Sequence, residues 1–213
     1  AKNTIFIPNR SFEVYLHFEY KRIEKEFRVP LFGNKYLLSI EERGVHPNQY
    51  DLLADAGIRI PKQFINPKSM DRLCIVKVAE AERPYERAFF LASSGAEYAK
   101  KSTALVAQKR ITKQALAAAV IEEFVVGTPV NFNFFYSPIH NRLELLGTDT
   151  RRQTNLEGFL RIPAMYQKDV LDHMPLSYEE SGHITVTVLE SMLEQAFAMG
   201  EAFVAACKRF HPA

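Results

Sequence analysis

Two hydrophobicity patterns follow one another between residues 119 and 155, and together they constrain the fold more than any other part of the chain. A mostly apolar run covers residues 120–126 and is followed by a Gly-Thr-Pro turn at 127–129. Residues 130–136 then alternate between two faces, and residues 142–148 form another strand-like run after a short polar loop. These patterns predict a strand followed by a β-hairpin.

Polar side chains gather at both ends of this predicted sheet. Glu122 and Glu123 interrupt the apolar run, and the hairpin ends in the polar cluster 149–155, which contains two arginines and two amides. A sheet with carboxylates at one end and arginines at the other is suited to hold a polar ligand. An ordinary meander with a solvated rim explains the same pattern, and periodicity alone leaves both interpretations open.

The composition excludes several classes of partner. The chain has 213 residues, 47% of them hydrophobic and 24% charged, which allows one large domain or two small ones with a real core. The net charge of +2 gives no bulk electrostatic reason to bind nucleic acid or a membrane surface. No apolar run approaches the roughly 20 residues that span a bilayer. The six histidines show no metal-ligand spacing.

The two cysteines indicate a reducing compartment. Cys74 and Cys207 both lie in apolar surroundings and are far apart in the sequence, so we expect two buried thiols rather than a disulfide. A cytoplasmic protein is therefore expected. The chain starts at Ala1 without a methionine and stops directly after a predicted helix, which indicates a fragment or a trimmed chain.

The remaining patterns predict an α+β arrangement with partly antiparallel sheets, since strands and helices alternate without a strict βαβ rhythm. The other strands are expected at residues 4–7, 29–32, 73–78 and 88–92, and the helices at 11–27, 34–42, 47–56, 96–109, 112–118, 164–172 and 187–210. Ser11 stands where an N-cap residue would begin the first helix. The last helix carries an apolar stripe at helical spacing, which is typical of a core-facing helix.

Eight short motifs occur along the chain in a characteristic order. They are PNRSF (8–12), FGN (32–34), AGIRIP (56–61), IVK (75–77), IEEFVVG (121–127), FFYSP (134–138), LELLG (143–147) and DTRRQTN (149–155). No motif is specific by itself, but in this sequence they resemble the archaeal formate-dependent FAICAR synthetase (PurP) family of ATP-grasp ligases or a close paralogue. The resemblance covers nearly the whole chain.

The resemblance implies an ATP-grasp fold that is truncated at both ends. Residues 1–34 would be the end of an N-terminal pre-ATP-grasp lobe, and residues 35–118 would contain linker helices and the small ATP-grasp subdomain. Residues 119–213 would form the large subdomain, incomplete at its C-terminus. The implied ligase of purine biosynthesis uses ATP and Mg²⁺ to formylate aminoimidazole carboxamide ribonucleotide (AICAR) with formate, through formyl phosphate.

The same resemblance assigns an ATP site. Lys77 matches the family lysine that reaches the phosphates, although a lysine at a strand end also serves to protect a sheet edge. Glu123 matches the acidic residue at the hinge, and Val125 and Val126 would line the adenine. Glu122 points to the opposite face of the strand from Glu123, and we expect it to be the solvated member of the pair.

Three more residues are assigned to the substrate and the chemistry. Ser11 matches a serine that holds the AICAR phosphate, with a plain N-cap as the alternative. Asn155 matches an asparagine that contacts the AICAR base or ribose. Arg151 would be catalytic, by stabilising charge on the transferred phosphoryl group, and a structural salt bridge is its equal rival.

Departures from the family pattern favour an alternative function. The loop 80–87 has a proline, no glycine and three acids where the family has a flexible glycine-rich loop. No Mg²⁺ ligands are expected within this chain, because those of ATP-grasp enzymes would follow residue 213. The alternative is a non-catalytic paralogue that binds a nucleotide or ribonucleotide. The aromatic side chains of Phe132, Phe134 and Tyr136 are expected to face either the core or a partner subunit, so a homo-oligomer is possible.

Overall fold

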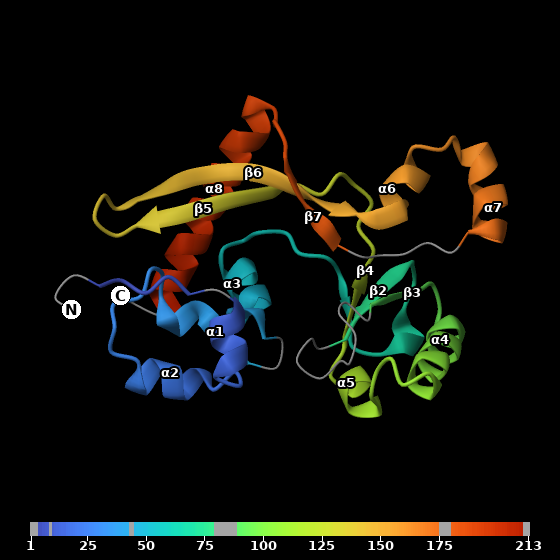
Figure 1. Cartoon of the computed structure of the whole chain (residues 1–213), viewed down its shortest axis with the longest axis horizontal. Coiled ribbons are helices and arrows are strands. Elements are labelled where there is room, and N and C mark those ends of the chain that lie inside the picture. The colour runs from blue at the N-terminus through green and yellow to red at the C-terminus, as the bar shows by residue number, and fades with distance from the viewer. Residues whose placement is uncertain (1–3, 9, 43–44, 79–88, 175–179, 211–213) are drawn as a thin grey trace. The chain divides into compact units, whose positions relative to one another are not determined.

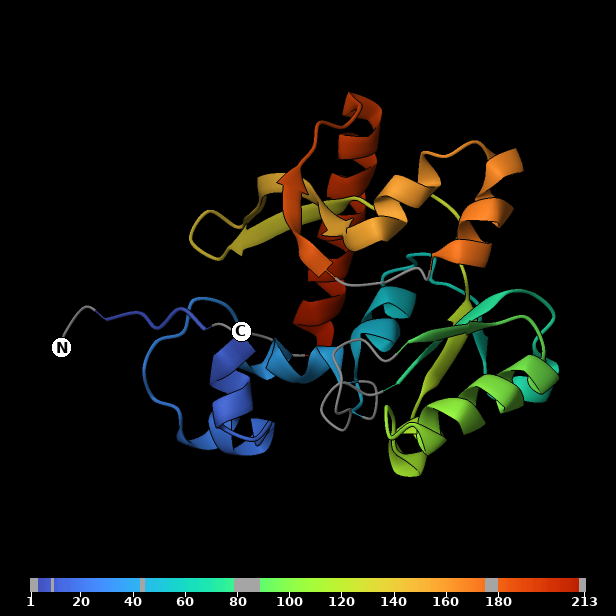
Figure 2. The ribbon, with the colours of Figure 1, turned by 45° about the vertical axis from the view of Figure 1, so that its right-hand side comes forward.

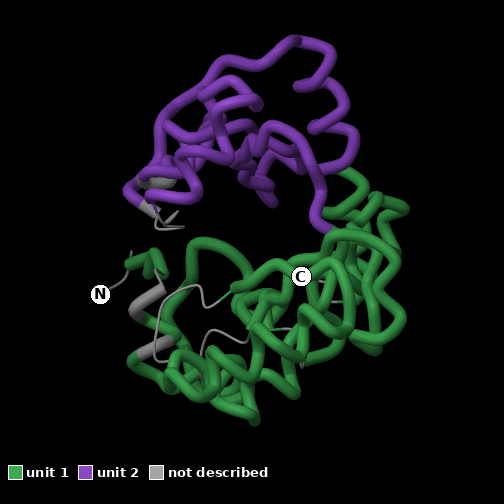
Figure 3. The backbone as a smooth tube through the Cα atoms, turned by 90° about the vertical axis from the view of Figure 1, so that its right-hand side faces the viewer, with its two compact units in different colours: residues 1–123, 201–213 green, residues 124–200 purple. Residues whose placement is uncertain are grey.

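The computed structural model describes residues 4–8, 10–42, 45–78, 89–174 and 180–210 (Figures 1 and 2). The chain divides into two compact units, drawn in two colours in Figure 3. The first unit comprises Ala1–Glu123 together with Glu201–Ala213, and the second comprises Phe124–Gly200. Each unit combines helices with an antiparallel sheet, in agreement with the predicted α+β class.

The first predicted helix is two helices. They are α1 (Arg10–Tyr15) and α2 (Tyr20–Glu26). The prediction of one continuous helix was wrong because His17 and Phe18 adopt positive φ angles of 52° and 56°, which end the helical path. Helical periodicity does not reveal such a break, since no proline or glycine marks it.

Three aromatic rings hold this N-terminal segment together. Phe6, Phe12 and Phe27 pack with ring centroids 4.8–5.3 Å apart, in tilted or edge-on arrangements. The two predicted strands of this segment reduce to one parallel β-bridge between Phe6 and Leu31. Aromatic packing, rather than a sheet, therefore organises these residues.

Two short helices follow, and asparagine side chains cap both. The 3₁₀ helix η1 (Lys35–Glu41) starts after Asn34, whose side chain accepts a hydrogen bond from a backbone N–H in the first turn. Asn48 and Asp51 form a complete capping box at the start of α3 (Gln49–Asp55). These helices confirm two predicted ones.

The sheet of the first unit has four strands in the order β1-β4-β2-β3, and all neighbouring strands are antiparallel. The strands are β1 (Gln63–Phe64), β2 (Cys74–Lys77), β3 (Phe90–Ala92) and β4 (Val120–Glu123). The helical elements near them are η2 (Pro67–Ser69), α4 (Gly95–Ala107) and α5 (Lys113–Ala117). The two-residue strand β1 was not predicted, because it is too short to show a period.

One face of this sheet forms the core of the unit. Cys74, Val76 and Ile121 are at most 6% exposed and pack with Tyr98 of α4, which lies along the strands in Figure 2. Successive residues of a strand point to opposite faces, so Lys77 and Glu122 lie on the other face. Alternation thus separates the apolar core from a charged face.

The second unit contains a three-stranded antiparallel sheet in the order β5-β6-β7. The strands are β5 (Asn131–Ser137), β6 (Arg142–Gln153) and β7 (Glu180–Thr185). The hairpin and its alternation are confirmed, and a register shift after Asn133 marks a bulge. The predicted second strand was too short, since β6 continues through the polar cluster, where the unpredicted β7 pairs with it.

Helices complete the second unit. They are α6 (Thr154–Leu160), α7 (Ala164–His173) and the first part of α8 (Glu190–Phe210), which crosses β5 and β6 in Figure 1. Phe197 of α8 packs edge-on against Phe134 of β5, with centroids 5.0 Å apart. A Cβ atom on Gly200 would collide with Leu143, so the glycine allows this close approach.

Candidate functional site

The first candidate site is a buried ion pair on the charged face of the four-stranded sheet. Lys77, the last residue of β2, pairs with Glu122 of the neighbouring strand β4. The Lys77 side chain is 24% exposed and the Glu122 side chain 4% exposed. A lysine that only protects a sheet edge does not explain this arrangement, because β2 lies inside the sheet between β4 and β3.

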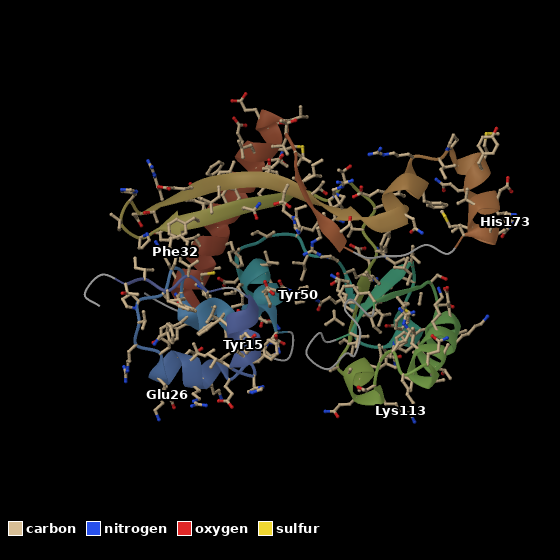
Figure 4. All side chains as sticks on the ribbon, viewed as in Figure 1. Tyr15, Glu26, Phe32, Tyr50, Lys113 and His173 are labelled. Carbon is tan, nitrogen blue, oxygen red and sulfur yellow. The ribbon has the colours of Figure 1, made fainter. Side chains whose placement is uncertain are left out.

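A tyrosine from a distant helix completes this pair. The hydroxyl of Tyr50, labelled on α3 in Figure 4, donates a hydrogen bond of 2.8 Å to the Glu122 carboxylate. Glu122 is therefore not solvated, and that prediction was wrong. Strand periodicity shows that Glu122 and Glu123 face opposite ways, but α3 decides which of them is covered.

Glu123 lies in an ion-pair network at the surface. Its carboxylate is 2.9 Å from Arg72 Nη1, and Asp71 lies between Arg72 and Lys62 in the same network. A backbone hydrogen bond at Lys62 and then the hydrogen bond from Arg72 lower the pKa of Glu123. The structure thus brings Lys77 together with Glu122, whereas Glu123 pairs with Arg72.

Tyr50→Phe tests the support of this pair. The substitution leaves one acceptor of a buried carboxylate without its donor, and we expect a loss of about 1–2 kcal/mol in the free energy of unfolding, measured by urea titration. Tyr15→Phe makes the same chemical change at a side chain that is 82% exposed, and it should leave stability unchanged. Equal effects at the two positions would contradict a supporting role for Tyr50.

The residues after β4 leave the sheet. Val125 and Val126 are 62% and 88% exposed, respectively, in the second unit. Two valines exposed to this extent offer apolar surface that a flat ring could cover. Their predicted contact with adenine stays a prediction.

A second cluster lies on one face of the sheet β5-β6-β7. Asp149 of β6 receives hydrogen bonds from the side-chain amides of Asn131 at 2.8 Å and Asn133 at 2.6 Å. Nδ1 of His183 on β7 lies 2.5 Å from the same carboxylate. Two amides and one imidazole, from two strands, therefore fix the position of Asp149.

Two predicted site residues belong to the same part of the second unit. Arg151 is exposed on β6 and pairs directly in register with His183, so both side chains project from the face that carries Asp149. Asn155 is half-buried in the first turn of α6, which begins where β6 ends. The predicted polar cluster is thus a continuous strand-to-helix segment.

The Asp149 cluster predicts a dependence of stability on pH. The hydrogen bond with His183, followed by those from Asn131 and Asn133, lowers the pKa of Asp149 from 3.8 to about 2. Because the folded-state pKa is depressed, this stabilisation is complete above the unfolded-state pKa and is lost as the pH falls from about 4 through 2. Asp149→Asn should flatten that part of the acid-unfolding curve, measured by circular dichroism.

A matched control separates this effect from general acid unfolding. Asp172→Asn makes the same change on α7, where the aspartate side chain is 54% exposed and pairs with Lys168. That variant should follow the parent curve. An Asp149→Asn curve of unchanged slope would show that the cluster adds no pH-dependent stability.

Ser11 lies two positions further into its helix than the predicted N-cap position. Helix α1 begins at Arg10, so Ser11 is inside the first turn and not at the preceding cap position. Assigned helix limits vary by one or two residues, and Ser11 remains at the helix N-terminus. Its predicted contact with a phosphate stays a prediction.

The predicted charged loop 80–87 lies outside the described residues. Within the described parts of the chain, no group of three or more His, Cys, Asp or Glu side chains could hold a metal ion. No helix there is both long enough and apolar enough to cross a bilayer.

Cys74 and Cys207 are buried free thiols, as predicted, and burial raises the pKa of both.

Comparison with known families matches two models along the chain. Residues 97–213 match "Domain of unknown function (DUF1297)", and residues 1–64 match "Protein of unknown function (DUF1246)". The chain belongs to the DUF1297 family.

Curated relatives of this DUF1297 chain carry a common name. It is 39% identical over 211 residues to the 5-formaminoimidazole-4-carboxamide-1-(beta)-D-ribofuranosyl 5'-monophosphate synthetase of Methanocaldococcus jannaschii, covering 99% of this chain and 56% of the relative. The protein of the same name from Methanothermobacter thermautotrophicus is 36% identical over 213 residues, covering 100% of this chain and 56% of the relative. The resemblance to the FAICAR synthetase family is confirmed.

A solved structure agrees with these relatives. The DUF1297 chain is similar to the IMP biosynthesis protein PurP from Thermococcus kodakaraensis, with a TM-score of 0.64 and 26% identity, over 99% of this chain and 57% of that one. The chain spans about 56% of the length of the two curated relatives named above. The similarity includes both units of the DUF1297 chain.

Several residues of these clusters were not identified as site residues from the sequence. Tyr50 and His183 lie outside the eight motifs, and Tyr50, Asp149 and His183 each acquire a partner from another element. For Asp149 a signal was available: it is the acidic residue within DTRRQTN, directly opposite Asn131 once the hairpin register is known. For Tyr50 and His183 no signal in this single sequence would have revealed the contacts.

Proposed function

We propose that this chain is part of an ATP-dependent ligase of IMP biosynthesis that formylates AICAR with formate to give FAICAR. The observation that carries the proposal is the identity of up to 39% over 99% of the chain to proteins named as this synthetase. The proposal includes an ATP-grasp fold and a cytoplasmic location. A homo-oligomer is compatible with it.

The geometry around Lys77 fits a nucleotide phosphate. An ammonium group has three donors, and Glu122 orients the side chain at the end of β2 while part of it stays exposed. The buried carboxylate of Glu122, which also accepts a hydrogen bond from Tyr50, holds the lysine side chain in one direction. We therefore assign Lys77 to the ATP phosphates, with Glu122 as its positioning partner.

The other nucleotide contacts rest on the motif positions. Glu123 would accept hydrogen bonds from the nucleotide, in competition with its ion pair to Arg72. Val125 and Val126 would form the apolar wall beside the adenine, for which their exposed side chains are suited. These roles follow the family motif IEEFVVG residue by residue.

The remaining roles concern AICAR and the transferred groups. Ser11 would hold the AICAR phosphate, because N–H groups at the start of a helix point outward and favour an anion. Asn155 would contact the base or ribose. Arg151 would stabilise negative charge on the phosphoryl group as formate is activated to formyl phosphate.

ATP-grasp chemistry also implies Mg²⁺, which requires hard oxygen ligands. The described residues contain no cluster that fits such an ion, and no step here is assigned to it. The part played by this chain is to bind and orient the nucleotide through Lys77 and to present AICAR and formate to it.

One observation supports a second candidate, a paralogue that binds a nucleotide or ribonucleotide without turnover. Three acids of the loop 80–87, Glu80, Glu82 and Glu86, would repel a triphosphate, although Arg83 and Arg87 offset part of this charge. The two candidates share the binding site and differ in catalysis.

Calorimetric titration distinguishes these candidates. ATP with Mg²⁺, and AICAR, should each bind to the intact protein, and addition of formate with both should then produce FAICAR and ADP. Binding of AICAR without any formate-dependent ADP formation would support the paralogue. Binding of neither compound would contradict both candidates.

A further inference from the structure

His183 and Asp149 form a dyad that the proposed nucleotide and substrate contacts do not use. The imidazole Nδ1 lies 2.5 Å from the carboxylate, whose oxygens also accept hydrogen bonds from Asn131 and Asn133. An ionised carboxylate only accepts hydrogen bonds, so the proton must lie on Nδ1 of His183. The ring nitrogen Nε2 then carries the lone pair in the neutral imidazole.

The dyad is accessible and lies on a rigid surface. The His183 side chain is 45% exposed, while that of Asp149 is 18% exposed. Both residues belong to adjacent hydrogen-bonded strands, β6 and β7, so their separation is set by the sheet and not by a loop. A half-buried orienting carboxylate beside a more exposed imidazole is the arrangement of a general base.

The position of the dyad relates it to the proposed chemistry. Arg151 pairs in register with His183, so a guanidinium and an imidazole project next to each other from the same sheet face. A cation beside a base suits a reaction in which a nucleophile loses a proton while a phosphate leaves.

Two other histidine–carboxylate pairs in the described residues lack these features. His140 lies 3.4 Å from Glu144 at the hairpin end, and its side chain is 61% exposed. His46 contacts Asp51, whose carboxylate already serves the capping box of α3. Only the carboxylate of Asp149, among these three, is held by two side-chain amides.

We propose that His183 is the general base that takes the proton from the 5-amino group of AICAR. This inference rests on the proposed function. The amine nitrogen attacks the formyl carbon of formyl phosphate, and its proton passes to Nε2 of His183. A C–N bond forms, the C–O bond to phosphate breaks, inorganic phosphate leaves beside Arg151, and the imidazole returns its proton to solvent. Asp149 acts as a positioning residue that fixes the tautomer.

The test separates formate activation from amine transfer. With AICAR, the intact His183→Gln protein should form FAICAR about 100-fold or more slowly, the usual size of a general base effect. In a second assay hydroxylamine, a stronger nucleophile, replaces AICAR and traps formyl phosphate. In this assay the His183→Gln protein should release ADP at the parent rate. Free imidazole should restore part of the AICAR reaction in His183→Ala.

His140→Gln is the matched control, since it removes an exposed imidazole from the turn that joins β5 and β6, and it should retain parent rates in both assays. An AICAR rate of His183→Gln within threefold of the parent would overturn the inference and leave the proposed function standing. An equal loss of rate with AICAR and with hydroxylamine would also overturn the inference, because it would indicate a structural role for His183. A parent protein that forms no FAICAR would overturn the proposed function and this inference with it.

Discussion

Replacing Lys77 by methionine is expected to abolish most ATP binding and also to destabilise the protein. Glu122 would remain as a buried carboxylate without its cation, and breaking such a pair costs about 3–5 kcal/mol. Loss of the phosphate contact should weaken ATP binding by about 2 kcal/mol or more, roughly 30-fold. Urea unfolding and calorimetric titration with ATP measure the two effects.

A double variant separates these effects. Lys77→Met combined with Glu122→Gln removes both charges, and its stability should return to within about 1 kcal/mol of the parent protein. Its ATP affinity should stay low, because the ammonium group is still absent. Lys168→Met, which breaks an exposed i,i+4 pair on α7, should change neither quantity by more than about 0.5 kcal/mol. Parent-like ATP affinity in the double variant would show that Lys77 does not contact the nucleotide.

Replacing Ile111 by alanine is expected to cost about 3 kcal/mol of unfolding free energy. Ile111 is 2% exposed and packs with Val78 and Ala115, both fully buried. Val78 directly follows Lys77, so this cluster anchors the end of the strand that carries the lysine. We expect a lower urea midpoint, measured by circular dichroism.

An exposed isoleucine provides the control for Ile111. Ile139 in the hairpin loop is 87% exposed, and its replacement by alanine should change stability by less than about 0.5 kcal/mol. A small effect at Ile111 would mean that the neighbouring side chains collapse into the space, since the cost of a cavity depends on how far the site relaxes.

Periodicity predicted those elements whose residues carry a strong local pattern. The strand at Val120–Glu123, the hairpin of β5 and β6, and the long helix α8 were all expected. The alternation of aromatic and amide side chains separates the two faces of β5, whereas the register shift after Asn133 was not expected. Local sequence therefore determined the central hairpin.

Elements that depend on a distant partner were not predicted. β1 has two residues and exists because it pairs with β4, and β7 exists because it pairs with the polar end of β6. Gln153 and its neighbours look like a loop in the sequence, but their backbone groups are paired in a sheet. No local pattern records such pairing, since it arises from contact between segments far apart in the chain.

The ends of β4 show the same division at the scale of single residues. By itself, the sequence determined that Glu122 and Glu123 lie on opposite faces of a strand, because side chains alternate along an extended backbone. Which carboxylate is buried was decided only by the tertiary structure, in which α3 places Tyr50 over Glu122 and β2 brings Lys77 beside it. A carboxylate is stable in a buried position only with partners, and those partners come from residues 45 and 72 positions earlier in the chain.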